Sequence, residues 1–210
     1  MSTHDDRTVT FEAADGTRLR GDLTIPDDAV AAAVVCHPHP QYGGNRFNPV
    51  VDALHRRLPD IGVASLRFDF REQFDGGAGE RLDASSALDL ITSAVPDRPL
   101  IASGYSFGAM IALGLDRSDL AARVLVAPPL VQLDNMPNAE VHVDIPTLVL
   151  TPAHDQFAPP DAVRPIVETW TDSTFETIEM TDHFIGGRTD AVATLVVDWL
   201  SGRWPPRSPR

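Results

Sequence analysis

One serine in this chain has neighbours that could make it a nucleophile. Ser106 lies at the centre of Gly104-Tyr105-Ser106-Phe107-Gly108, between an apolar run over 99–103 and a helix-forming run over 109–113. A serine on such a tight strand-to-helix turn has a strained backbone and an exposed hydroxyl, and flanking glycines let the neighbouring backbone come close. The pattern predicts a nucleophilic serine. The alternative is an ordinary serine in a glycine-rich loop.

A serine hydroxyl attacks at neutral pH only when a base takes its proton, and the base needs a carboxylate to orient it. Asp155 follows a strand predicted over 146–150, and His183 follows a strand predicted over 174–180. The three residues occur in the order serine, acid, histidine, and each follows a predicted strand. We therefore predict that Ser106, Asp155 and His183 form a catalytic triad.

Asp155 and His183 could each have another role, and other residues could supply the acid. Asp155 could only cap a turn, and His183 could be a surface histidine. Asp182 is the rival acid, although a residue adjacent to the histidine cannot easily turn back to its ring. Asp172 is a poorer rival because it follows a helix, and His154 is expected to face away or to line the rim.

Acyl transfer also needs two backbone amides that stabilise an oxyanion. Phe107, directly after the serine, is expected to supply one. The other is expected from the proline-rich loop after the strand predicted over 31–36. His39 is the first candidate there because the prolines on either side of it have no amide hydrogen, and Gln41 and Tyr42 stand behind it.

Further residues are expected to contact the substrate, and they are Gln41, Tyr42, Tyr105, Leu130 and Met136. The last two lie within 127–145, a segment too short for a lid domain, so we expect an open site. His37 and His39 could instead hold a metal, but no third ligand with matching spacing accompanies them. We expect no metal and no cofactor, and a small molecule with an acyl group as the substrate.

Strand and helix patterns alternate along the chain. Two alternating runs around Asp15-Gly16 predict an antiparallel pair at a sheet edge. Strands are predicted over 8–13, 18–25, 31–36, 63–70, 99–103, 122–126, 146–150 and 174–180, and helices from Pro49 and over 82–95, 109–113, 160–170 and 190–200. This order predicts an α/β fold with a mostly parallel sheet, helices on both faces and the site at the carboxyl ends of the strands. We expect one domain over 1–200 and a flexible tail over 201–210.

The charge balance is strongly acidic, with a formal net charge of -13, 17 arginines and no lysine. Nucleic acid is therefore an unfavourable partner, because binding phosphates needs positive charge. The acidic surface is either an adaptation to high salt or a consequence of coding bias. No apolar run is long enough for a membrane span, so we expect a soluble, cytoplasmic protein. Cys36 is expected to be a buried thiol, and nothing in the sequence indicates an oligomeric state.

Several segments together resemble one known group of proteins. His37-Pro38-His39-Pro40-Gln41-Tyr42-Gly43-Gly44 resembles the H-P-H-P-x-x-G-G loop of small bacterial and archaeal α/β-hydrolases, and the segments over 66–71, 75–80, 104–109 and 183–184 are similar to the same group. The resemblance runs from about Phe11 to Leu200. It implies an α/β-hydrolase fold without a cap domain, and a serine hydrolase that uses the triad above. Glu72-Gln73-Phe74 departs from the longer loop of that group, so one wall of the pocket is expected to differ.

Together these observations predict a serine hydrolase that cleaves carboxylic ester or thioester bonds through an acyl-enzyme on Ser106. A serine peptidase for short peptides would use the same three residues. A catalytically silent binding protein on the same fold is the alternative from another class, because a fold alone does not fix an activity.

Overall fold

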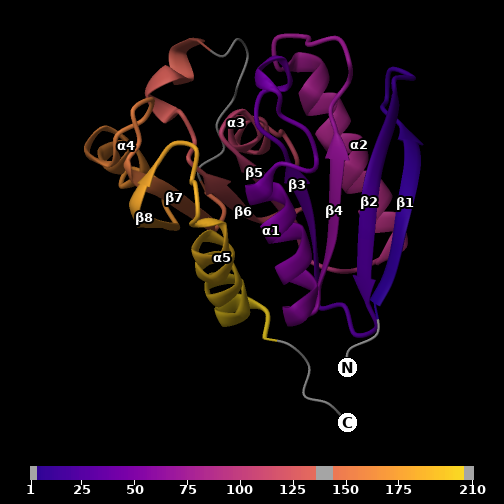
Figure 1. The fold of residues 1–210 in the computed structure, drawn as a ribbon. Helices are drawn as coiled ribbons and strands as arrows, with labels where there is room; N and C mark the ends of the chain where they lie inside the picture. The colour runs from indigo at the N-terminus through magenta and orange to yellow at the C-terminus, as the bar shows by residue number, and fades with distance from the viewer. Residues whose placement is uncertain (1–3, 136–143, 206–210) are drawn as a thin grey trace.

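A single sheet forms the centre of the computed structural model, which describes residues 4–135 and 144–205 (Figure 1). Eight strands pair in the order β1-β2-β4-β3-β5-β6-β7-β8. They are β1 His4–Glu12, β2 Arg18–Pro26, β3 Ala31–Cys36, β4 Val63–Asp69, β5 Leu100–Tyr105, β6 Leu120–Val126, β7 Thr147–His154 and β8 Ser173–Asp182. From β4 to β8 every neighbouring pair is parallel. The predicted α/β class with a mostly parallel sheet is confirmed.

The antiparallel strands lie at one edge of the sheet, as predicted. β1 pairs with β2 over its whole length, and β2 pairs antiparallel with β4. The turn between the first two strands closes with the Gly16 amide 2.8 Å from the Ala13 carbonyl oxygen. Gly16 has φ of 85°, a left-handed conformation that suits glycine.

Two layers of helices cover the sheet. They are α1 Pro49–Arg57 and α5 Thr189–Arg203 on one face, in front in Figure 1, and α2 Ala78–Ala94, α3 Phe107–Leu113 and α4 Pro160–Val167 on the other. Short 3₁₀ turns are η1 Pro40–Tyr42, η2 Leu58–Ile61 and η3 Leu130–Asn135. Successive residues of β3 belong alternately to the two cores, so all six are buried. Burial on both faces explains why the central strands read as continuous apolar runs.

Two helix starts show what local sequence can and cannot predict. α1 begins at Pro49 as predicted, with the Asn48 side chain accepting the Val50 amide at 3.0 Å. α2 begins at Ala78, four residues before the predicted start. The buried Glu80 carboxylate accepts the amides of Asp75 (2.9 Å) and Gly77 (2.8 Å) and so fixes this first turn.

The helix ends also differ from the prediction. α4 ends at Val167 rather than at Trp170, because the chain tightens there into a turn with the Trp170 amide 3.0 Å from the Val167 carbonyl oxygen. α5 continues to Arg203, three residues past the predicted end, and Trp204 packs against the core. The second half of the predicted tail, residues 206–210, lies outside the described residues. In the part of the chain that the structure covers, no helix has the length and apolar character needed to cross a membrane.

Candidate active site

The carboxyl ends of four parallel strands bring the predicted site residues to one edge of the sheet. His37 directly follows β3, Ser106 follows β5, Asp155 follows β7 and His183 follows β8. Parallel strands end at the same edge, so four segments far apart in sequence converge there.

Ser106 has the strained backbone that its pattern predicts, with φ of 54° and ψ of −115°. Its amide donates to the Val126 carbonyl oxygen at 2.8 Å, which ties the turn to β6. A Cβ atom at Gly104 would lie 2.2 Å from the Gly108 carbonyl oxygen, and one at Gly108 would lie 2.3 Å from the Cys36 carbonyl oxygen. Both glycines are therefore required by close backbone approach.

The side chains of Ser106, His183 and Asp155 form one chain of hydrogen bonds. Ser106 Oγ lies 2.9 Å from His183 Nε2, and His183 Nδ1 lies 2.7 Å from Asp155 Oδ2. The other oxygen, Asp155 Oδ1, accepts the amides of Phe157 (2.8 Å) and Ala158 (3.0 Å). Asp155 is 2 % exposed and His183 is 7 % exposed, so solvent hardly screens this contact. With Nδ1–H directed at the carboxylate, Nε2 is free to accept the serine proton.

The rival residues contact other groups. Asp182 is exposed, and its Oδ1 accepts the Phe184 amide at 3.1 Å. Asp172 is exposed and interacts with Arg203 at 3.4 Å. His154 is exposed at the end of β7. The structure thus brings Asp155, and neither rival acid, to the His183 ring.

The Tyr105 side chain is buried and forms a hydrogen bond with the backbone of His183. Its hydroxyl donates to the His183 carbonyl oxygen at 2.7 Å, and the His183 amide lies 3.4 Å from Gln156 Oε1. Burial, with the carboxylates of Asp155 and Asp182 nearby, raises the pKa of Tyr105, so the hydroxyl keeps its proton and donates. The prediction that Tyr105 contacts the substrate is therefore corrected. Its side chain is only 4 % exposed and belongs to the core on the α1 and α5 face of the sheet.

The other expected substrate contacts have different outcomes. Leu130 is 1 % exposed and packs into the core beside α2, α3 and α4, so its expected place in an open acyl-side wall is also corrected. Met136 lies outside the described residues. Gln41 and Tyr42 are exposed on the loop after β3, with the Tyr42 ring centroid 5.0 Å from that of His39. Their contact with substrate stays a prediction.

His37 holds the loop after β3 through both ring nitrogens. Its Nε2 accepts the Phe70 amide at 3.0 Å, so Nδ1 carries the proton and donates to the Pro38 carbonyl oxygen at 2.6 Å. Burial lowers the pKa of His37, which favours this neutral form. Neither nitrogen is left for a metal. Within residues 4–135 and 144–205, no three His, Cys, Asp or Glu side chains are grouped to hold one.

The loop amides narrow the choice of oxyanion donors. The Gln41 amide donates to His39 Nδ1 at 3.2 Å, and the Tyr42 amide donates to the His39 carbonyl oxygen at 3.1 Å. Both are therefore occupied within the loop. Phe107 is the first residue of α3, where an amide has no acceptor within its helix, and its ring centroid lies 4.8 Å from that of His39. This places the two preferred donor residues next to each other.

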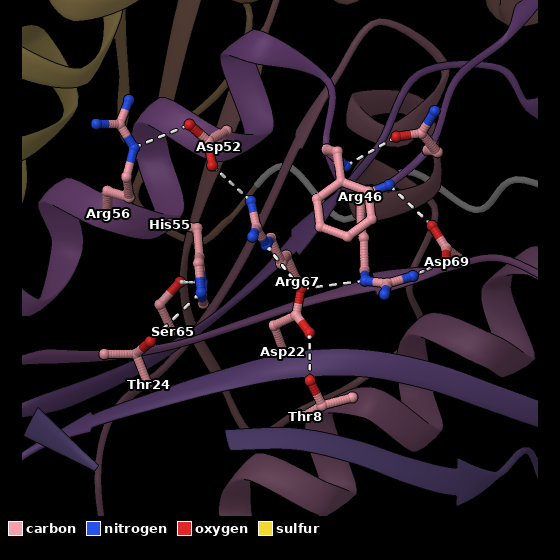
Figure 2. Close-up of polar contacts among 12 residues, drawn as sticks. Thr8, Asp22, Thr24, Arg46, Asp52, His55, Arg56, Ser65, Arg67 and Asp69 are labelled. Carbon is pink, nitrogen blue, oxygen red and sulfur yellow. Dashed lines mark hydrogen bonds and ion pairs between the residues drawn. The ribbon is translucent and has the colours of Figure 1, made fainter. Parts of the chain in front are cut away.

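A partly buried ion network that sequence reasoning missed anchors the same loop (Figure 2). The Arg46 amide donates to Asp69 Oδ1 at 2.9 Å, and its guanidinium pairs with Asp69 and, at 3.1 Å, with Asp22. Arg67 joins Asp22 (3.2 Å) to Asp52 of α1 (2.7 Å). Arg46 is 7 % exposed, so these pairs are partly shielded from water. The segment over 66–71 that carries the family resemblance therefore ties the loop to β2, β4 and α1.

Aromatic rings border the site on two sides, and sequence reasoning did not select them. Phe157 and Phe184 lie with ring centroids 4.8 Å and 5.9 Å from that of His183. Phe74, from the segment that departs from the family pattern, lies 4.5 Å from His39. The available signal was proximity in sequence, because Phe157 and Phe184 stand within two residues of predicted triad members.

Comparison with known proteins extends these observations. No family model matches the chain. An uncharacterised protein from Rickettsia prowazekii is 30 % identical over 184 residues, which cover 80 % of this chain and 77 % of that protein. A serine hydrolase without a lid from Xanthomonas campestris superposes with a TM-score of 0.84 at 27 % identity, covering 98 % of this chain and 97 % of the other.

Two further solved structures are also similar to this chain. A protein of unknown function from Agrobacterium tumefaciens, described as an α/β hydrolase, has a TM-score of 0.81 at 31 % identity, over 94 % of this chain and 96 % of the other. An α/β serine hydrolase homologue from Coxiella burnetii has a TM-score of 0.81 at 26 % identity, over 95 % and 98 %. The fold, the strand-end site and these similarities lead to one conclusion: the chain belongs to the α/β hydrolases.

Proposed function

We propose that this protein is a serine hydrolase that cleaves carboxylic ester or thioester bonds of small substrates. The observation that carries the proposal is the hydrogen-bond chain from Ser106 Oγ through His183 to the buried Asp155. A nucleophile, a base and an orienting carboxylate in contact are what acyl transfer to serine requires.

In the first half of the reaction, Ser106 Oγ attacks the substrate carbonyl carbon while its proton passes to His183 Nε2. Asp155 stabilises the imidazolium that forms. The negative oxygen of the tetrahedral intermediate accepts hydrogen bonds from the amides of Phe107 and His39. The intermediate then expels the alcohol or thiol, which takes the proton from Nε2, and leaves the acyl group on Ser106.

In the second half, water replaces the leaving group. His183 Nε2 removes a proton from the water as its oxygen attacks the acyl carbon. The second intermediate releases the carboxylic acid, and Ser106 Oγ regains its proton from His183. The segment over 127–145 is too short for a lid domain, so we expect simple saturation kinetics on soluble, short-chain esters, without activation by micelles.

The test is a panel of acetyl compounds, an ester, a thioester and a peptide amide, measured with wild type and Ser106→Ala. We expect ester or thioester cleavage by wild type, and kcat lower by at least about a thousandfold in a folded Ser106→Ala. A variant with near wild-type kcat would exclude Ser106 as the nucleophile. Preference for the peptide amide would instead identify a peptidase that uses the same residues.

A further inference from the structure

We propose that Phe157 and Phe184 form a leaving-group shelf beside His183, and that this shelf selects esters of neutral alcohols that carry a flat apolar ring. The inference rests on the proposed serine-hydrolase function and names the substrate class of the same site.

The shelf consists of the Phe157 and Phe184 rings, and each of them packs edge to face against the imidazole ring of His183. The Phe157 ring lies 4.8 Å from the His183 ring at 74°, and the Phe184 ring lies 5.9 Å from it at 87°. The two phenyl rings are 6.4 Å apart at 86°. Aromatic rings prefer such edge-to-face arrangements, and a third ring from a ligand could join them in the same way.

Both rings are exposed to solvent. Phe157 is 46 % exposed and Phe184 is 66 % exposed. Their backbone amides are hydrogen-bonded: the Phe157 amide donates to Asp155 Oδ1 at 2.8 Å, and the Phe184 amide donates to Asp182 Oδ1 at 3.1 Å. Covering such exposed apolar surface with an apolar group of a ligand is favourable.

The chemistry decides which part of the substrate meets these rings. The proton on His183 Nε2 must reach the leaving-group oxygen, so this oxygen lies next to the imidazole. The carbonyl oxygen is directed instead at the amides of Phe107 and His39. The substituent on the leaving oxygen is therefore the part that reaches Phe157 and Phe184.

Charge restricts the class of alcohol. Asp182, whose carboxylate accepts the Phe184 amide, is exposed, and the chain has a net charge of -13 with no lysine. A polyanionic leaving group such as coenzyme A is repelled by this surface, whereas a neutral alcohol is not. A benzyl-type alcohol meets both the apolar and the charge requirement.

The experiment compares kcat/KM for benzyl acetate and n-hexyl acetate, which share the acyl group and have primary alcohols of similar apolar size. We expect wild type to prefer benzyl acetate by about threefold to tenfold. Phe157→Ala and Phe184→Ala should each reduce this ratio, and Phe184→Tyr should retain it. The matched control is Leu82→Ala, which removes an exposed apolar side chain of α2 and should leave the ratio unchanged.

Each other outcome has a definite meaning. An unchanged ratio in both alanine variants overturns the shelf. An equal fall for both esters assigns the rings to holding His183 and likewise overturns a role in selection. Acetyl-coenzyme A cleaved as efficiently as benzyl acetate overturns the charge argument. If wild type hydrolyses neither ester faster than Ser106→Ala, the proposed function fails, and the shelf fails with it.

Discussion

Asp155 is almost fully buried next to His183, and both of its carboxylate oxygens accept hydrogen bonds. Asp155→Asn would keep the shape of this group but would offer an amide to the His183 Nδ1 side, which favours the wrong tautomer. We expect kcat to fall by about 10³- to 10⁴-fold with the fold retained. Asp182→Asn is the matched control and should stay within about twofold of wild type. The reverse order of effects, measured on one ester, would move the acid to Asp182.

His55, a buried histidine outside the site, links stability to pH. His55 Nδ1 lies 3.0 Å from Ser65 Oγ, and its Nε2 lies 3.3 Å from Thr24 Oγ1 (Figure 2). Burial lowers the pKa of His55 to about 4, with Arg67 adding to the effect. The unfolded chain takes up this proton near pH 6.5, whereas the folded chain resists it until about pH 4. Above pH 6.5 His55 is neutral in both states and does not oppose folding. As the pH falls from 6.5 to about 4, the unfolded chain binds the proton and the folded chain does not, so the free energy of unfolding decreases.

We expect the free energy of unfolding to fall between pH 7 and pH 4, with a share on the order of 3 kcal/mol from His55. Urea unfolding of His55→Gln at several pH values checks this, since the variant should show a shallower pH dependence than wild type. His154→Gln, at an exposed position, is the control and should follow wild type. A His55→Gln profile parallel to that of wild type would exclude this residue as the source.

At the residue level, the structure brings together the three side chains that chain order and local chemistry selected. Ser106, Asp155 and His183 could be selected because each follows a strand and the three residue types complete one reaction. Tyr105 was misplaced because a position beside a nucleophile does not reveal which face of β5 its side chain occupies. In the structure the Tyr105 side chain belongs to the core between the sheet and helices α1 and α5, where its hydroxyl donates a hydrogen bond to the His183 carbonyl oxygen.

At the scale of elements, the helix after the nucleophile needs support from outside itself. α3 has seven residues, too few for an isolated helix to be stable. Arg123 of β6, 1 % exposed, donates from its guanidinium to the carbonyl oxygens of Ala112 (3.1 Å) and Leu115 (3.2 Å) at the end of this helix. The planar guanidinium can reach several carbonyls at once.

Arg123→Lys tests this support, because one ammonium cannot reproduce the fork of donors. We expect a loss of about 1–3 kcal/mol in urea unfolding at pH 7. The control is Arg56→Lys, at an exposed pair with Asp52 in α1, which should change stability by less than about 0.5 kcal/mol. If both variants are as stable as wild type, the carbonyl contacts of Arg123 do not support α3.

Element boundaries were predictable where the signal is local. Asn48 and Pro49 specify the start of α1 by capping and by a fixed φ, and a run of six apolar residues specifies β3. The start of α2 was placed too late because it depends on Glu80, whose carboxylate is buried against two loop amides. A buried acidic side chain is not expected from its residue type, so only the packed structure reveals it.

At the scale of the whole molecule, charge is the dominant feature. A net charge of -13 destabilises the compact state by self-repulsion, and salt screens it, with a Debye length of about 10 Å at 0.1 M and 3 Å at 1 M. Salt also weakens arginine–aspartate pairs, but exposed pairs contribute little. We therefore expect the melting temperature to rise clearly as KCl is raised from 0.1 M to above 1 M. A melting temperature independent of KCl would favour coding bias as the origin of the acidic surface.

The central claim is that Ser106 is an activated nucleophile, and a fluorophosphonate tests it most directly because stable labelling requires an activated hydroxyl. We predict that wild type gains one covalent adduct, that peptide mapping by mass spectrometry locates it on Ser106, and that folded Ser106→Ala gains none. Labelling should also weaken strongly in Asp155→Asn. An unlabelled wild-type protein with a native circular dichroism spectrum, or an adduct that maps to another residue, would contradict the account.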